Sequence, residues 1–249
     1  MMTTDAAAPF APGSLPRTPS RTLSVVRMQL INRQTYIWIP LIILGGAFLL
    51  ALAVYAMLAN AGVTGPKYGG GAQAPLWYFG VVGIQALTLT FPFSQAMSVT
   101  RREFFLGTLL TAALTSSILA GIAVVGGLVE RATDGWGVNG WFFGLPWMWE
   151  AGPLGALLVN FVAAMLFFVI GFWAATIYKR FGGIALTFVL VGIGALLIAG
   201  MWLIGRLDAW ASVLGWFSTV GVVGLSLWGL VLAAVLAAIA FLTLRRAIP

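Results

Sequence analysis

Apolar residues gather in six long stretches that short polar gaps separate: 36–59, 76–99, 104–129, 154–177, 183–204 and 219–244. A hydrocarbon core about 30 Å thick needs about 20 apolar residues per helix, and each stretch reaches that length. None alternates polar and apolar residues with a period of two, as the strands of a membrane β-barrel do. The pattern therefore predicts an all-α polytopic membrane protein with six transmembrane helices, because helices satisfy their own backbone groups in lipid.

The six stretches use most of the 249 residues, so one membrane domain over 21–249 is predicted, with no separate catalytic domain. Composition agrees, since 8% of the residues are charged and soluble domains carry about 25%. Residues 1–20 are rich in Pro, Ala, Ser and Thr and lack an apolar core, which predicts a disordered cytoplasmic tail. Segment 21–34 is either an N-terminal interfacial helix or a basic flank that only sets topology. The apolar face expected for such a helix holds Leu23, Val26, Leu30 and Ile31.

Basic residues fall mainly on one side of the predicted membrane. Of the 13 Lys and Arg residues, three lie in the opposite gaps (Lys67, Arg131 and Arg206), which leaves ten. Those ten are Arg17, Arg21, Arg27, Arg33, Arg101, Arg102, Lys179, Arg180, Arg245 and Arg246. Basic residues are retained in the cytoplasm, so both termini are predicted to be cytoplasmic. The net charge of +7 is thus explained by basic residues that lie next to the membrane lipid and set the orientation of the chain, and it does not indicate nucleic-acid binding.

The gaps on the outer side differ in character. Segment 62–75 is dense in Gly and Pro and is expected to be flexible. Segment 130–153 carries four tryptophans, which form an aromatic belt, belong to a short interfacial helix, or contact a substrate as a lid. Segment 205–218 is apolar but too short for another crossing, so a re-entrant helix and an outer gate are predicted there.

No chemistry is visible along the chain. It has no Cys and no His, so thiolate or imidazole metal sites are excluded, and no phosphate-binding G-x-x-x-x-G-K-[ST] occurs. The centres of the spans hold no ionisable residue that could carry a proton. The chain is therefore predicted to be no enzyme, to hold no cofactor and to contain no energy source of its own.

Neutral polar residues recur on helical stripes within the spans. One stripe holds Gln85, Thr88 and Gln95, with Pro92 expected to kink the helix. A second stripe holds Thr108, Thr111 and Thr115, and Asn160 stands near the start of the fourth span. These residues either line a translocation path or form hydrogen bonds between helices.

Small residues mark the last two spans and either pack within the chain or form a subunit interface. They are Gly183, Gly192, Gly194 and Gly200 on the fifth span and Ala233, Ala234, Ala237, Ala238 and Ala240 on the sixth.

The gap between the second and third spans carries the most specific local pattern. Thr100 and Glu103 have the spacing of a capping box, which starts a helix at the membrane edge. Arg101 and Arg102 belong to the first turn of that helix. Together with the run 91–93 (Phe-Pro-Phe), the stretch 98–107 (Ser-Val-Thr-Arg-Arg-Glu-Phe-Phe-Leu-Gly) resembles the ABC-2-type permeases of bacterial ABC transporters.

The resemblance implies a role for these residues and a set of partners. Thr100, Arg101, Arg102 and Glu103 would lie on the element that docks on an ATPase subunit, which supplies ATP-Mg chemistry. Two permease chains, as a homo- or heterodimer, would form the path of an exporter in the bacterial cytoplasmic membrane, with ATPase subunits below. The alternatives are a membrane scaffold or sensor-associated protein that transports nothing, and a passive channel, although charged rings and filter-like loops are missing.

Overall fold

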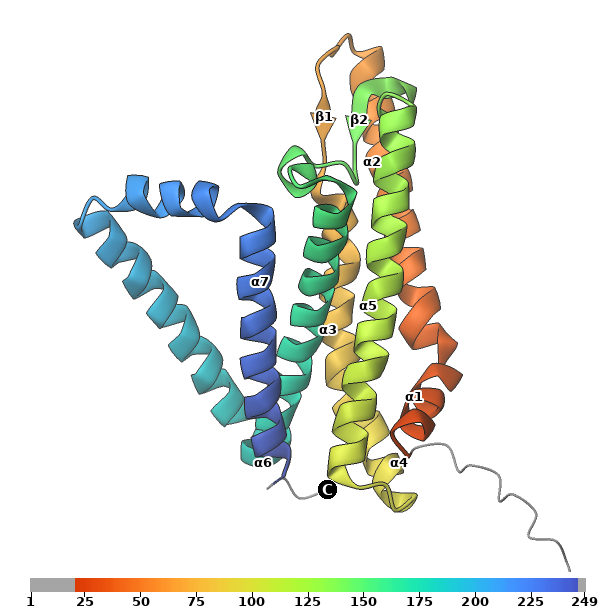
Figure 1. Ribbon diagram of the computed structural model, residues 1–249, viewed down its shortest axis with the longest axis vertical. Coiled ribbons are helices and arrows are strands. Elements are labelled where there is room, and N and C mark those ends of the chain that lie inside the picture. Colours follow the sequence, from red (N-terminus) through yellow and green to blue (C-terminus); the bar gives the residue numbers. More distant parts are fainter. Residues whose placement is uncertain (1–20, 246–249) are drawn as a thin grey trace, which may run out of the picture.

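The computed structural model describes residues 21–245, and the predicted tail 1–20 lies outside them. The chain is almost entirely helical, which confirms the all-α prediction (Figure 1). Its helices and strands are α1 (Arg21–Ile31), α2 (Ile39–Asn60), β1 (Lys67–Tyr68), α3 (Ala74–Gln85), α4 (Phe91–Ala96), α5 (Arg101–Ala132), β2 (Gly140–Trp141), α6 (Gly152–Arg206) and α7 (Trp210–Leu244). Short π-helical turns (Gln34–Trp38, Ala86–Thr90), 3-10 turns (Gly70–Gln73, Pro146–Trp149) and an irregular turn with left-handed residues (Gly135–Asn139) join them.

Five helical stretches within residues 21–245 are long and apolar enough to cross a membrane. These stretches are Gln34–Asn60, Gly70–Ala96, Arg101–Ala132, Gly152–Arg206 and Trp210–Leu244. The segments predicted to be cytoplasmic meet at the end of the bundle where α1 lies, called the α1 end below (Figure 1). The opposite end carries β1 and β2 and is called the strand end.

Helix α6 has 55 residues, which corresponds to about 80 Å of α-helix. That length far exceeds a hydrocarbon core of about 30 Å. The helix is broken at Gly182, whose φ of 83° and ψ of 174° are not helical. Glycine tolerates this conformation because it has no Cβ. The break separates residues 152–181 from 183–206, near the predicted boundary between the fourth and fifth spans, and six crossings remain a prediction.

The first part of α6 forms the centre of the bundle and contacts α3, α5 and α7. It approaches α3 closely because both helices carry glycine at the contact: a Cβ on Gly83 would overlap the Phe168 carbonyl oxygen, and a Cβ on Gly171 would overlap the Gly80 carbonyl oxygen. Such close approach of small residues is how helices associate in lipid.

The second part of α6 leaves the bundle altogether. Residues 183–206 run obliquely away from it, residues 210–220 cross back towards it, and residues 222–244 descend beside it (Figure 1). The second corner is at Gly221, with φ 62° and ψ −178°. No residue from 183 to 221 is buried. The predicted re-entrant segment 205–218 thus includes a helix that lies across the bundle axis, while its role as a gate stays a prediction.

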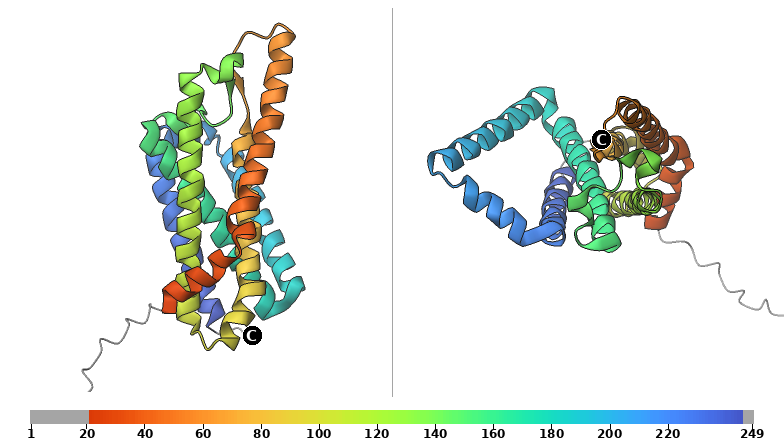
Figure 2. Two further views of the ribbon diagram at one scale, coloured as in Figure 1. Left: turned by 90° about the vertical axis from the view of Figure 1, so that its right-hand side faces the viewer. Right: turned by 90° about the horizontal axis from the view of Figure 1, so that it is seen from above.

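Helix α1 crosses the lower end of α5 (Figure 2). The predicted apolar face packs only in part: Val26 is buried and Leu30 half-buried, but Leu23 and Ile31 are exposed. The packed face holds Val25 and Gln29 instead of these two residues. The correction has a steric cause at Gly107 of α5. A Cβ there would lie 2.6 Å from the Cβ of Val25, so glycine lets α1 dock directly on the α5 backbone.

The second predicted span departs from α-helical geometry where Pro92 predicted a kink. A π-helical turn covers Ala86–Thr90, and Pro92 stands in the first turn of α4. Proline lacks the N–H that an uninterrupted α-helix would use at this position, and π turns commonly occur where the regular hydrogen bonding of a helix is interrupted. The helix then ends at Ala96, three residues before the predicted limit of 99.

Candidate functional site

The turn between α4 and α5 lies at the α1 end and carries the four residues singled out from the sequence. Ser98 adopts a left-handed φ of 57°, which reverses the chain. The capping box is then complete as predicted. Thr100 Oγ1 accepts from the Glu103 N–H at 3.2 Å, and a Glu103 carboxylate oxygen accepts from the Thr100 N–H at 3.0 Å and from its hydroxyl at 2.8 Å. Two of the unpaired backbone donors at the start of α5 are thereby satisfied, which fixes the turn.

The two arginines of this turn have different environments. Arg101 Nη1 donates to the Leu244 carbonyl at 3.1 Å and to the Arg245 carbonyl at 2.8 Å. Arg102 is exposed. A cation at these carbonyls satisfies orphan acceptors at the C-terminal end of α7, which is the negative end of its dipole. Arg101 therefore joins the start of α5 to the end of α7, and Arg102 presents the outward charge of the turn.

A hollow of about 740 Å³ opens beside the turn, lined by Arg101, Arg102, Phe241 and Arg245. Five acidic residues lie within 21–245. Glu103 alone among them belongs to the α1 end, and Thr100 already engages it. The described part of the α1 end is thus strongly basic and suits an anionic surface or ligand.

Three of the predicted path residues lie on α5, and all three are buried. Thr108 Oγ1 accepts from Gln29 Nε2 of α1 at 2.8 Å. Thr111 Oγ1 donates to the Gly107 carbonyl, and Thr115 Oγ1 donates to the Thr111 carbonyl, so both bonds stay within α5. Thr115 also lines a crevice of about 10 Å³ beside α2 and α3, which has room for about one water.

The remaining predicted path residues are half-buried. Thr88 donates to the Ile84 carbonyl at 2.9 Å, Gln95 to the Val99 carbonyl at 3.0 Å and Asn160 to the Ala156 carbonyl at 2.8 Å. Gln85 ends α3 just before the π turn. Within residues 21–245, Thr108 is thus the one predicted path residue that bonds to another helix. That bond matches the interhelical alternative, and a path through this stripe stays a prediction.

Sequence reasoning missed a site at the strand end, where Glu130 is completely buried near the end of α5. One carboxylate oxygen accepts from Trp136 Nε1 at 2.9 Å and from the Phe142 N–H at 2.6 Å. The other accepts from the N–H groups of Phe143, at 3.0 Å, and Gly144. A carboxylate in the last turn of a helix is unfavourable, because that end of the helix dipole is negative. The position of Glu130 was therefore the one signal in the sequence that some other group stabilises its charge, but it does not say which group.

The outer loops are more organised than their composition indicated. β1 pairs in parallel with β2, so segment 62–75, expected to be flexible, is joined to segment 130–153 by backbone hydrogen bonds. Lys67 is buried and donates to the Val138 carbonyl at 3.0 Å. Two of the loop tryptophans also pack inward, since Trp149 is buried and Trp136 reaches Glu130. An aromatic belt requires side chains that face the lipid headgroups, and of the loop tryptophans Trp147 is the exposed one.

The described residues contain no group of three or more His, Cys, Asp or Glu side chains that could hold a metal ion. Comparison of the chain with protein-family models, with curated proteins and with solved structures finds no match.

Proposed function

We propose that this chain is the transmembrane subunit of an ATP-driven transporter of the ABC-2 type, an exporter in the bacterial cytoplasmic membrane. The chain brings no nucleotide-binding motif, so separate ATPase subunits with ATP-Mg supply the energy. These subunits dock at the α1 end, which is the cytoplasmic end in this proposal. The chain itself is then no enzyme.

The observation that carries the proposal is the connection between the capped turn and α7. The capping box makes the start of α5 a stiff element, so force applied at the turn moves α5 as a unit. Arg101 passes the same displacement to the end of α7 through the Leu244 and Arg245 carbonyls. An ATPase that pushes on Arg102 would thus move two helices at once, which is the mechanical requirement for coupling hydrolysis to a membrane path.

A second permease chain is part of the proposal, and the splayed helix supports it. Residues 183–206 form an apolar helix without a buried residue, and nothing lies within 4 Å of a Cβ built on Gly192, Gly194 or Gly200. Packing within the chain therefore does not use these glycines. Small residues on an uncovered apolar helix suit close contact with another membrane helix, and the translocation path would run between the two chains.

Charge reversal at Arg102 tests the docking role. Arg102→Glu is expected to abolish copurification with the proposed ATPase partner and to reduce the stimulated ATP turnover of that partner at least tenfold, because an exposed attractive charge becomes repulsive. Lys179→Glu is the matched control, since Lys179 is also exposed and basic near the α1 end but lies outside the turn. Unchanged docking and turnover in Arg102→Glu, or an equal loss in the control, contradicts the proposal.

A further inference from the structure

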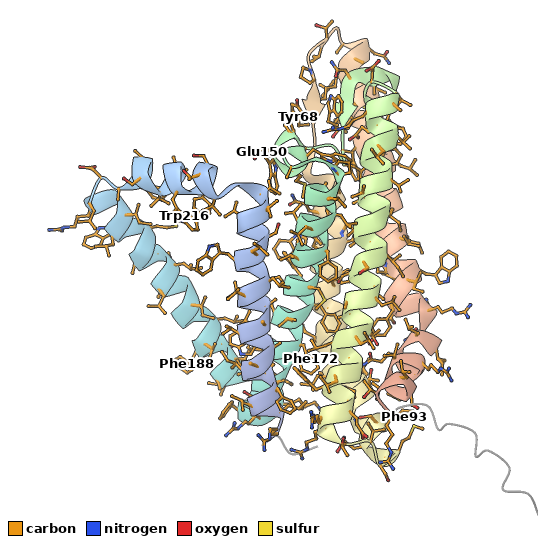
Figure 3. The ribbon with its side chains drawn as sticks, in the orientation of Figure 1. Tyr68, Phe93, Glu150, Phe172, Phe188 and Trp216 are labelled. Atoms are coloured by element: carbon orange, nitrogen blue, oxygen red, sulfur yellow. The ribbon has the colours of Figure 1, made fainter. Side chains whose placement is uncertain are left out.

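A second basic hollow lies between the break in α6 and the end of α7. It measures about 480 Å³ and is lined by Arg180, Ile239, Leu242, Thr243 and Arg245. Arg180 precedes the Gly182 break by two residues, so the hollow joins the corner of α6 to the last turn of α7. Nitrogen-tipped side chains gather at this end of the molecule, below Phe172 and Phe188 (Figure 3).

The lining changes from apolar to basic along α7. Ile239 and Leu242 are 43% and 58% exposed, so their side chains form an open apolar wall. Arg245 is six positions beyond Ile239, about 9 Å further along the helix axis towards the α1 end. The hollow therefore has an apolar wall at the depth of lipid chains and arginines at the depth of lipid headgroups.

The arginines of this hollow have no acidic partner in the part of the chain that the structure describes. Arg180 stacks on the Phe181 ring at 4.6 Å, and Arg245 lies 5.9 Å from the Phe241 ring centroid. Stacking leaves the in-plane N–H groups of a guanidinium available. Thr243 donates its hydroxyl to the Ile239 carbonyl at 2.9 Å. Within residues 21–245 these two guanidinium groups donate no hydrogen bond, and donors of this geometry match the oxygens of a phosphate.

We propose that this hollow binds an anionic phospholipid, with the headgroup phosphate between Arg180 and Arg245 and an acyl chain along Ile239 and Leu242. Basic pockets between transmembrane helices on the cytoplasmic side bind such headgroups. The phosphate chemistry alone would also suit a soluble phosphate, but the exposed apolar wall gains contacts only from a lipid chain. The bound lipid bridges the α6 corner and α7. This inference rests on the membrane character of the helices and does not require an ATPase partner.

Native mass spectrometry of the purified full-length chain tests the site, with phosphatidylglycerol, phosphatidylcholine and soluble glycerol phosphate as probes. The first phosphatidylglycerol is expected to bind at least tenfold more tightly than phosphatidylcholine. Arg180→Gln combined with Arg245→Gln is expected to weaken phosphatidylglycerol about 25-fold, at about fivefold for each charge near the surface. Ile239→Ser combined with Leu242→Ser is expected to weaken both lipids and to leave glycerol phosphate binding unchanged.

The matched control is Arg21→Gln combined with Lys179→Gln, which removes two positive charges from the α1 end outside the hollow. Its affinity for phosphatidylglycerol is expected to change less than twofold. Helical content by circular dichroism verifies that each variant folds, and if the double arginine variant does not, the two single variants carry the test at about fivefold each. An equal loss in the control means diffuse attraction and overturns the site. Unchanged phosphatidylglycerol affinity in the arginine variants also overturns it, and glycerol phosphate binding as tight as the lipid overturns the lipid assignment.

Discussion

Replacing Glu130 by glutamine is the perturbation with the most direct consequence in this structure. The carboxylate is fully buried and accepts four hydrogen bonds, two at each oxygen. An amide of the same shape has one oxygen and one NH₂ group. Whichever way the glutamine turns, two of the four N–H donors of the loop face another donor. The substitution therefore keeps the volume of the side chain and removes half of its acceptors.

The magnitude follows from those two lost bonds. A hydrogen bond to a charged group contributes about 1.5–3 kcal/mol, and a buried donor left without a partner costs a similar amount. Two such losses come to about 3–6 kcal/mol for opening the loop 135–149. Total domain stabilities are about 5–15 kcal/mol, so the effect is large but concentrated at one end of the bundle.

Hydrogen exchange measures this opening directly. The amides of Phe142, Phe143 and Gly144 donate to the carboxylate, so their protection in Glu130→Gln is expected to fall by about two to four orders of magnitude. Amides at the centre of α5 are expected to keep their protection. Glu150→Gln is the matched control, because Glu150 is an exposed acid near the same loop.

Unchanged protection at the three loop amides in Glu130→Gln would refute the reasoning, because the carboxylate would then not hold the loop. An equal loss in Glu150→Gln would also refute it, since the effect would then come from charge at the surface and not from the buried acceptor.

Three further predictions concern helix packing and capping. Gly171→Val is expected to lower the free energy of unfolding by more than about 3 kcal/mol, because the new Cβ would overlap a carbonyl of α3. Gly192→Val is the control and is expected to change the free energy of unfolding little, because the space around Gly192 is open. Thermal unfolding in detergent compares the two variants. Thr108→Val leaves a buried donor of Gln29 without a partner and is expected to cost about 1–3 kcal/mol, while adding Gln29→Leu restores most of the loss, and a double-mutant cycle checks the coupling. Thr100→Ala removes the N-cap of α5 and is expected to cost about 1 kcal/mol and to raise amide exchange in the first turn of the helix alone.

The helices and the capped turn were predictable because they depend on local sequence. Apolar length sets the membrane helices, and residues three apart set the capping box between Thr100 and Glu103. Gly182 stands in the short gap between two apolar stretches, so the break in α6 was also expected. In each case the residues that decide the structure are neighbours along the chain.

The burial of Val25 and Gln29 on α1 and the Glu130 site were not predictable, because distant residues decide both. Val25 and Gln29 turn inward since Gly107 and Thr108 meet them on α5, 79 or more positions away. Glu130 is buried because the backbone of a loop 12–14 residues further on folds over it. Residue type along a single helix does not reveal such partners, and a polar residue can therefore lie on the buried face.

The corners at Gly182 and Gly221 have a mechanical consequence. Residues 183–206, 210–220 and 222–244 form the three sides of a triangle that closes where Arg180 and Thr243 line one hollow (Figure 1). Three rigid helices joined end to end in a closed triangle keep fixed angles as long as each helix keeps its length. Residues 183–206 can therefore change their tilt only if one corner opens or if residues 222–244 slide along the bundle. A shift of 222–244 along the bundle thus sets the tilt of 183–206.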